Sequence, residues 1–187
     1  MLRFVMMIFM LIHVMNAAAK DTELEFYHPF EGVEGLPVTS IASSYTGECV
    51  QQSQRIKRED AWRCVAGGQT YDPCFIKPYG KKMQAFCPES PWSTQSVEIK
   101  LRHATMDLAQ ASLDLSRTYP WVVELSTGEK CKAVDEGEMF DGLPIHYRCE
   151  NQSILMGHLQ RCKAEWSMLK REPNGQVDTV LISKAWF

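Results

Sequence analysis

Residues 63–75 read RCVAGGQTYDPCF and place two cysteines ten positions apart, around a Gly-Gly pair and an Asp-Pro step. The spacing of Cys64 and Cys74 does not fit a C-x-x-C redox pair or a paired zinc knuckle. Gly67-Gly68 and Asp72-Pro73 favour turns that let the chain reverse between the two sulfurs. The stretch therefore predicts a covalent staple, with the partner of each sulfur left open.

Seven cysteines occur in the chain, and disulfide formation is their expected fate in an oxidising compartment. We expect Cys131 to pair with Cys149, because both lie in strand-like segments of one antiparallel sheet. The four upstream cysteines are expected to pair among themselves. An odd count leaves one sulfur over, and Cys162, within LQRCKAEW, is the candidate free thiol. The expected disulfide cysteines are Cys49, Cys64, Cys74, Cys87, Cys131 and Cys149.

The first nineteen residues have the features of a secretory signal peptide. Arg3 precedes an apolar run from Phe4 to Met15, and three alanines follow shortly after the run. The run is shorter than the ~20 apolar residues that a transmembrane helix requires. The small residues before Lys20 suit cleavage there, with an uncleaved anchor as the alternative. We therefore expect a secreted or periplasmic protein with no membrane span after cleavage.

The charge balance gives no indication of nucleic-acid binding. The chain has 20 Lys and Arg against 23 Asp and Glu, a net charge of −3. The densest basic cluster, residues 55–58, is followed at once by Glu59 and Asp60, which indicates a solvated surface of mixed charge. No nucleic-acid partner is expected.

The pattern of apolar residues predicts an α+β fold that is mostly antiparallel β, with one or two short helices. Residues 96–102, SVEIKLR, alternate apolar and polar positions, as a half-buried strand does. Hairpins are predicted around residues 126–128 and around Pro173-Asn174-Gly175. The segment IHYRC, residues 145–149, is a further predicted strand.

Two segments predict short helices. Residues 57–64, KREDAWRC, could form a helix that carries Trp62 inward. Residues 103–117, HATMDLAQASLDLSR, space their apolar positions three and four apart, as on one helical face. The resulting organisation is a signal peptide over 1–19, an N-terminal arm over 20–47 and a disulfide-stapled α+β domain over 48–187.

Exposed aromatic residues are the candidate binding contacts. Phe26, Tyr27 and Phe30 lie close together in the arm, which has little regular structure of its own. Trp92 follows Pro91 in a turn-like segment and could be exposed, whereas the other tryptophans are expected in the core. The arm therefore packs on its own domain or on a protein or glycan partner.

One set of residues imitates a zinc site. His146 and Cys149 are followed by His158 and Cys162 at spacings that zinc accepts. Export favours disulfides instead, and residues 146 and 149 would face opposite sides of a strand. No cofactor or metal is therefore expected, and the histidines are interpreted as surface residues.

The chain shows no G-x-S-x-G elbow and no papain-type cysteine context. The paired carboxylates Glu59-Asp60 and Asp135-Glu136 lie in hydrophilic stretches, where a solvated face is the ordinary explanation. We therefore assign no catalytic residue from the sequence.

Several short cysteine- and tryptophan-containing blocks follow one another along the chain: DAWRC, YDPCF, FCPESPW, YPWVVELSTGEKC, HYRC and the terminal AWF. This series resembles an uncharacterised extracytoplasmic bacterial domain of secreted and lipoprotein-like proteins. The resemblance covers residues 49–187, and it implies a disulfide-stapled exported domain without catalytic residues to transfer. Cys162 lies outside the shared pattern.

Taken together, these features predict an exported, non-enzymatic binding or effector module of unknown ligand. Two alternatives stay open: an exported hydrolase acting on envelope or host polymers, and a stapled protein inhibitor. A cleft that holds a histidine against a carboxylate would favour the enzyme. A continuous exposed apolar patch would favour the binder.

Overall fold

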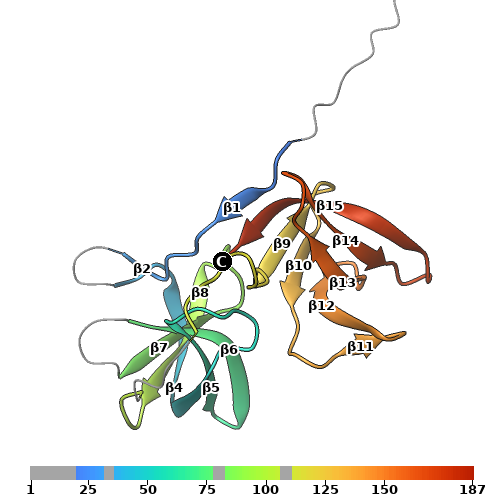
Figure 1. The fold of residues 1–187 in the computed structure, drawn as a ribbon. Helices are drawn as coiled ribbons and strands as arrows, with labels where there is room; N and C mark the ends of the chain where they lie inside the picture. Colours follow the sequence, from blue (N-terminus) through green and yellow to red (C-terminus); the bar gives the residue numbers. More distant parts are fainter. Residues whose placement is uncertain (1–19, 32–35, 78–82, 106–110) are drawn as a thin grey trace, which may run out of the picture.

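The computed structural model describes residues 20–31, 36–77, 83–105 and 111–187, and the expected signal peptide lies outside them. The described chain forms two β-barrels side by side (Figure 1). None of the described residues forms a helix. The prediction of an α+β fold with short helices is therefore wrong, and the fold is all-β.

Fifteen strands are formed by the described residues. In chain order they are β1 (Glu23–Glu25), β2 (Phe30–Glu31), β3 (Leu36–Pro37), β4 (Ser40–Gln52), β5 (Ala61–Ala66), β6 (Gln69–Ile76), β7 (Gln84–Pro88), β8 (Gln95–Leu101), β9 (Val122–Leu125), β10 (Lys130–Ala133), β11 (Met139–Phe140), β12 (Leu143–Cys149), β13 (Ile154–Gln160), β14 (Trp166–Arg171) and β15 (Val177–Trp186).

The first barrel contains β4 to β8 in sequence order and is closed by the long strand β4. The second half of β4 pairs antiparallel with β5, whereas its first half pairs parallel with β8. Strand β4 thus closes the sheet by pairing with β5 and with β8. Closure removes the exposed edges that an open sheet would present. The predicted strand at residues 96–102 is confirmed as β8.

The second barrel follows the order β9, β10, β12, β13, β14 and β15, and it closes because β15 also pairs with β9. The hairpin predicted around residues 126–128 is confirmed as β9 and β10, and the one around Pro173-Asn174-Gly175 as β14 and β15. The segment IHYRC is confirmed as part of β12. The short strand β1 adds to this barrel in parallel with the end of β15.

Three disulfides connect strands within the barrels. Cys49–Cys64 joins β4 to β5, Cys74–Cys87 joins β6 to β7, and Cys131–Cys149 joins β10 to β12. Cys49 is directly opposite Cys64, and Cys131 directly opposite Cys149, in the strand register. Residues 63–75 thus supply Cys64 to one disulfide and Cys74 to another, and these two cysteines are not bonded to each other. Cys162 forms no disulfide and is exposed.

Neither predicted helix forms, because main-chain N–H and C=O groups of these segments form hydrogen bonds to neighbouring strands or to side chains of other segments. Residues 61–66 are strand β5, which pairs with β4 on one side and with β6 on the other, so Trp62 is buried without a helix. In the second segment, residues 106–110 lie outside the described part, and the rest has no regular structure. There the main chain of Ala111 bonds to the Gln52 side chain, and the Leu113 N–H donates to Glu59.

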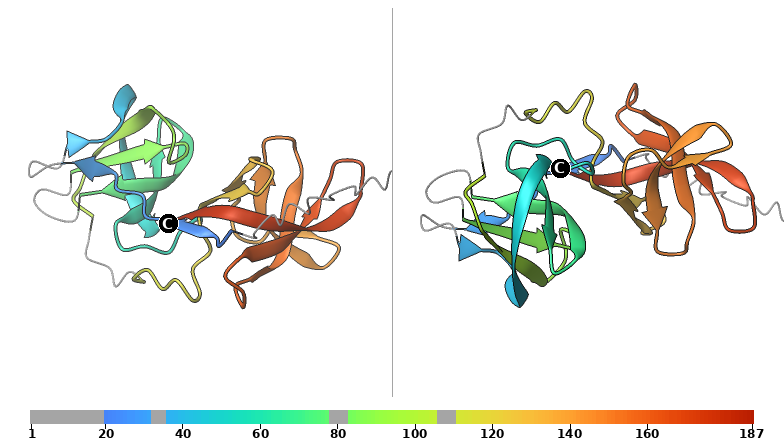
Figure 2. Two further views of the ribbon diagram at one scale, coloured as in Figure 1. Left: turned by 90° about the horizontal axis from the view of Figure 1, so that it is seen from above. Right: turned by 90° about the horizontal axis from the view of Figure 1, so that it is seen from below.

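An aromatic core occupies the junction between the barrels. Tyr27 from the arm, Phe75 from β6 and Trp121, just before β9, are mutually in contact, with ring centroids 5.2 to 5.8 Å apart. All three side chains are buried, and Phe187 at the end of β15 joins the same cluster. The C-terminal end of β15 accordingly lies between the two barrels (Figure 2). This cluster is therefore common to both barrels, and the first barrel has a second core of its own around Trp62 and Ile99.

Arg58 stands at the centre of this junction. Its guanidinium forms two 2.6 Å bonds to Asp60 and lies 4.9 Å from the centre of the Phe75 ring. It also donates to the main-chain oxygens of Tyr27 and Phe187. Arg58 thus connects the first barrel, the arm and the end of the second barrel.

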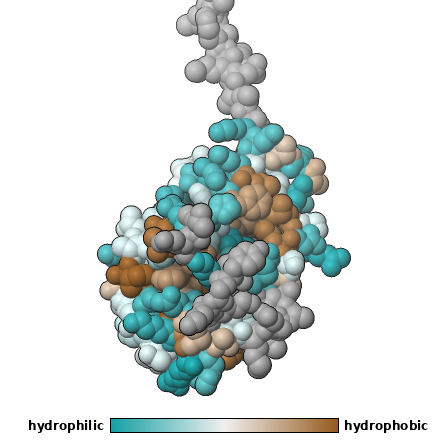
Figure 3. Space-filling view, turned by 90° about the vertical axis from the view of Figure 1, so that its left-hand side faces the viewer, coloured by the Kyte–Doolittle hydropathy of each residue, from teal (hydrophilic) through white to brown (hydrophobic). Residues whose placement is uncertain are grey.

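Exposed apolar side chains do not form one continuous patch on the face shown in Figure 3, where several groups are separated by polar residues. No helix among the described residues is long and apolar enough to cross a membrane.

We predict that Arg58→Met destabilises the protein by about 3 kcal/mol, because it leaves Asp60 and the buried carbonyl of Tyr27 without the Arg58 donor, while the Phe187 carbonyl keeps only the Tyr27 N–H. The methionine keeps an apolar side chain beside Phe75. Urea unfolding measures the change. Arg102→Met is the matched control, since Arg102 is 60% exposed and pairs only with the exposed Glu48. Its loss should cost less than about 1 kcal/mol. Equal losses in the two variants would contradict the role given to Arg58.

We also predict that replacing Cys131 and Cys149 together by alanine lowers the free energy of unfolding by about 3 kcal/mol, because the crosslink no longer restricts the unfolded chain. The loop that this bridge closes spans 18 residues. Chemical unfolding without reductant measures the effect. Cys162→Ala is the control and should leave stability unchanged, since that side chain is exposed. An unchanged double variant would show that this staple adds no stability.

Candidate functional site

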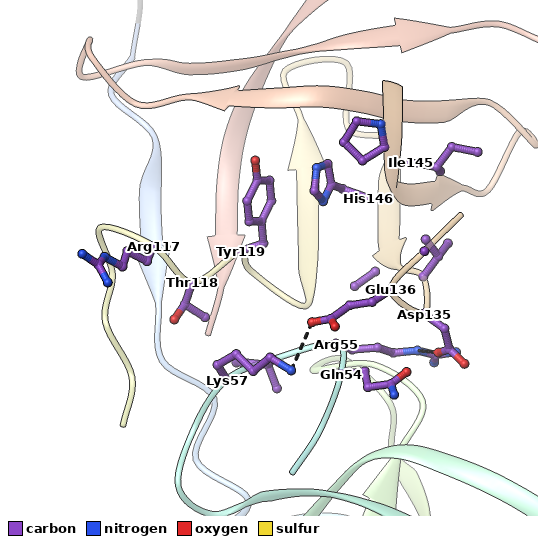
Figure 4. A pocket seen from close by; sticks show the side chains of 15 residues that line it. Gln54, Arg55, Lys57, Arg117, Thr118, Tyr119, Asp135, Glu136, Ile145 and His146 are labelled. Atoms are coloured by element: carbon purple, nitrogen blue, oxygen red, sulfur yellow. Dashed lines mark hydrogen bonds and ion pairs between the residues drawn. The ribbon is translucent and has the colours of Figure 1, made fainter. Parts of the chain in front are cut away.

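A cleft of about 430 Å³ lies at the junction of the two barrels (Figure 4). The first barrel contributes the segment between β4 and β5, residues 54–57, and the second contributes residues around the end of β10 and the middle of β12. The connection between the barrels, residues 117–119, forms a third side. Apolar side chains line part of it: Ile56, Ala133, Val134, Pro144 and Ile145.

Tyr119 and His146 form an aromatic pair on the cleft wall. Their rings are stacked, with centroids 4.0 Å apart and planes 10° from parallel. Figure 4 shows the two side chains next to each other. His146 lies where the pairing of β12 with β13 shifts register, and β13 shifts again after Met156. These irregularities free the main chain of Gly157, to which His146 forms a hydrogen bond.

The surroundings of the His146 ring shift its pKa in the direction that favours the neutral form. Partial burial lowers its pKa below the usual 6.5, and the charge of nearby His158 adds to this effect. The hydrogen bond to Gly157 opposes the shift without cancelling it. A neutral imidazole carries one acceptor nitrogen and one donor nitrogen, so this residue can form hydrogen bonds at neutral pH without adding charge.

The acidic residues of the cleft are used to connect the barrels. Asp135, which follows β10, lies 3.1 Å from Arg55 and 3.1 Å from Arg63, both of the first barrel. Glu136 lies 3.1 Å from Lys57. Burial opposes ionisation of Asp135, but the hydrogen bonds and charges of the two arginines outweigh it, and its pKa is lowered. The carboxylate therefore stays ionised and bound.

Asp72 extends this network into the first barrel. It accepts hydrogen bonds from the Ser53 hydroxyl and the Gln54 N–H, and its carboxylate lies 3.3 Å from Arg63. Burial nevertheless dominates and raises the pKa of Asp72. Asp72 therefore has a structural role: it accepts hydrogen bonds from Ser53 and Gln54 and pairs with Arg63.

A second hollow, of about 460 Å³, adjoins the cleft and shares Arg117 and Tyr119 with it. Its remaining lining comes from Ser116 and from residues 158–162 at the end of β13. Arg161 lies 5.5 Å from the centre of the Tyr119 ring. Tyr119 thus has His146 and Arg161 packed against it.

The four residues whose spacing imitates a zinc site do not lie together as one group. Cys149 is bonded to Cys131 and cannot act as a thiolate ligand. His146 lines the cleft, whereas His158 and Cys162 line the adjoining hollow. Within the described residues, no three His, Cys, Asp or Glu side chains are grouped as a metal site.

The four predicted aromatic contacts lie away from the cleft lining. Tyr27 is buried in the junction core, and Phe30 and Trp92 are partly buried against it. Phe26 is 45% exposed and packs beside Phe187. Trp92 contacts Trp186 and has the Lys130 ammonium 4.5 Å from its ring centre.

Sequence reasoning missed Tyr119, Arg161 and the Arg55–Asp135 pair as site residues. Tyr119 is 27 positions from His146, and their stacking depends on β12 being placed beside the barrel connection. The only local signal is Tyr119-Pro120, which ends an irregular segment rather than a predicted strand. Comparison with known proteins gives no family model, no curated protein and no solved structure that matches this chain.

We predict that the pKa of His146, measured by NMR titration, lies below 6.5, so that the folded protein binds this proton less readily than the unfolded chain. His146 therefore does not affect the free energy of unfolding well above pH 6.5. It lowers this free energy progressively as the pH falls from 6.5 through the folded pKa. Tyr119→Ala exposes the ring and should move its pKa back toward 6.5. Tyr45→Ala, at an exposed tyrosine of the first barrel, is the control and should leave the pKa of His146 unchanged. A His146 pKa above 6.5 in the native protein would contradict the burial of the ring.

Proposed function

We propose that the protein is an exported binding module whose ligand site is the cleft between the barrels. The observation that carries this proposal is the combination of an apolar wall with the fixed, neutral Tyr119–His146 pair in one hollow of about 430 Å³. Ligand sites are typically concave and largely apolar, with a few polar groups that fix orientation. Three intramolecular disulfides are typical of extracytoplasmic proteins, and secretion or periplasmic location is part of the proposal.

The ligand class that fits this cleft best is a protein segment. Aliphatic side chains such as Ile56 and Ile145 suit the side chains of a peptide. Sugar recognition commonly uses an open aromatic face, but His146 and Arg161 pack against Tyr119. A protein partner is therefore favoured over a glycan.

An exported hydrolase is the second candidate, and one observation favours it. His146 has a lowered pKa and shares the cleft with Asp135 and Glu136. A general base needs a free imidazole oriented by a carboxylate. Here the two carboxylates pair with Arg55, Arg63 and Lys57, and His146 bonds to the main chain of Gly157. The cleft acids are thus committed to joining the barrels, which supports binding over catalysis.

A photo-crosslinking amino acid at position 145 tests the cleft as the binding site. We expect it to capture a specific protein partner after irradiation in the native culture or host extract, with the captured peptide identified by mass spectrometry. The same amino acid at position 181 is the matched control, because Leu181 is an exposed aliphatic residue on β15 outside the cleft.

Unlabelled protein in excess should compete with the crosslink at position 145. Equal capture at both positions, or capture at 181 alone, would refute the cleft as the site. Turnover of a polymer substrate that is lost in His146→Gln and retained in Tyr45→Ala would establish the hydrolase instead.

A further inference from the structure

The hollow beside the cleft contains an arginine that forms no direct ion pair within the described part of the chain, although the charge of Asp114 acts on it from farther away. The Arg161 guanidinium lies between two aromatic rings, 5.5 Å from the centre of Tyr119 and 5.1 Å from that of Trp166. It donates to the carbonyl of Leu115 and, at 2.6 Å, to that of Thr118. These bonds use two of its five N–H donors. No carboxylate of the described residues lies within ion-pair distance of it.

Burial makes this arrangement costly. It lowers the pKa of Arg161, whereas the charge of Asp114 and the neighbouring tyrosines raise the pKa only partly. Asp114 itself is bonded to Ser116 and lies 3.8 Å from Arg117. A partly buried charge gains most from a partner that brings the opposite charge and fills the remaining donors.

Apart from the buried Leu159, the other described residues of the hollow are basic or polar. The Arg117 side chain is 87% exposed, and His158 and Gln160 are exposed as well. None of the described residues lining the hollow is acidic, and the one carboxylate paired with Arg117, that of Asp114, lies outside the lining. The hollow therefore differs from the cleft, whose own lining includes Asp135 and Glu136 beside its cations.

We propose that this hollow binds a carboxylate of an acidic peptide segment, which continues from the apolar cleft across the shared residues Arg117 and Tyr119. The inference rests on the proposed function and specifies its ligand: a protein segment with aliphatic residues followed by an acidic one. Arg161 supplies a planar donor pair of the kind that carboxylates prefer, and Arg117 closes over the bound group. An acidic glycan shares the charge but lacks aliphatic groups for the cleft.

Cys162 provides a native reporter, because this exposed thiol lines the hollow. The rate of its alkylation by uncharged iodoacetamide is measured on the oxidised protein. We expect acetyl-Leu-Ile-Glu-Glu-amide to slow alkylation about tenfold at saturation. The matched peptide acetyl-Leu-Ile-Gln-Gln-amide should have no effect. Added salt should weaken the protection, since exposed charges are screened within about 10 Å at 0.1 M ionic strength.

The double variant Arg117→Gln with His158→Gln removes an exposed cation and an exposed imidazole, and it leaves Arg161 and its main-chain bonds in place. We expect its affinity for the acidic peptide to fall about tenfold, as the loss of a charge-assisted hydrogen bond produces. Arg102→Gln, which removes an exposed cation of the first barrel, should bind as the native protein does. Circular dichroism confirms that each variant is folded.

Two outcomes would overturn the proposal. Equal protection by the Glu and Gln peptides would show that the carboxylate is not recognised. Protection by dextran sulfate that exceeds that of the peptide would assign the hollow to an acidic glycan. Crosslinking at position 145 is measured independently of the alkylation of Cys162. A captured partner without protection at Cys162 refutes the acidic ligand alone, whereas protection without a captured partner refutes the cleft.

Discussion

The double salt bridge between Arg58 and Asp60 is the interaction on which the shape of the protein depends. A guanidinium in a largely apolar junction is stable only when its donors are satisfied, and Arg58 finds acceptors in the two carboxylate oxygens and in the carbonyls of Tyr27 and Phe187. Those carbonyls belong to segments 160 positions apart in the chain. A charged residue thus fixes where the arm and the last strand meet the first barrel.

The aromatic core around this salt bridge explains why two small barrels behave as one body. The apolar residues Tyr27, Phe75 and Trp121 bury one another across the boundary. Charged pairs of Arg55, Arg63 and Lys57 with Asp135 and Glu136 cross the same boundary nearer to solvent. The boundary is therefore apolar where it is buried and ionic where it is partly exposed.

Local strand signals could be predicted from the sequence, but barrel closure could not. The alternation in residues 96–102 and the Asn174-Gly175 turn are short-range features, and both gave correct strands. Closure depends on β4 pairing with β8 and on β15 pairing with β9, which joins segments more than 50 positions apart. The predicted helices failed for the same reason: β5 is held by two neighbouring strands, and the segment after residue 110 takes hydrogen bonds from the first barrel.

The candidate site was less predictable than the fold because its residues follow no spacing rule. His146 was singled out for a metal spacing, but its actual partner is Tyr119. The basic run at residues 55–58 was interpreted as a solvated surface, yet Arg58 is buried and Arg55 joins the barrels. Charge counts along a sequence do not distinguish a cation that is exposed from one that is paired across an interface.

The position of the cleft couples ligand binding to the junction. Its walls come from both barrels and from the connection between them, so a ligand in the cleft contacts all three parts at once. A ligand that binds only the assembled junction stabilises the folded state in proportion to its affinity and concentration. The same geometry implies that the fixed partners of Asp135 and Glu136 keep the walls at a set distance before any ligand arrives. Preformed walls reduce the ordering cost of binding, which suits recognition of a peptide that has no fixed structure of its own.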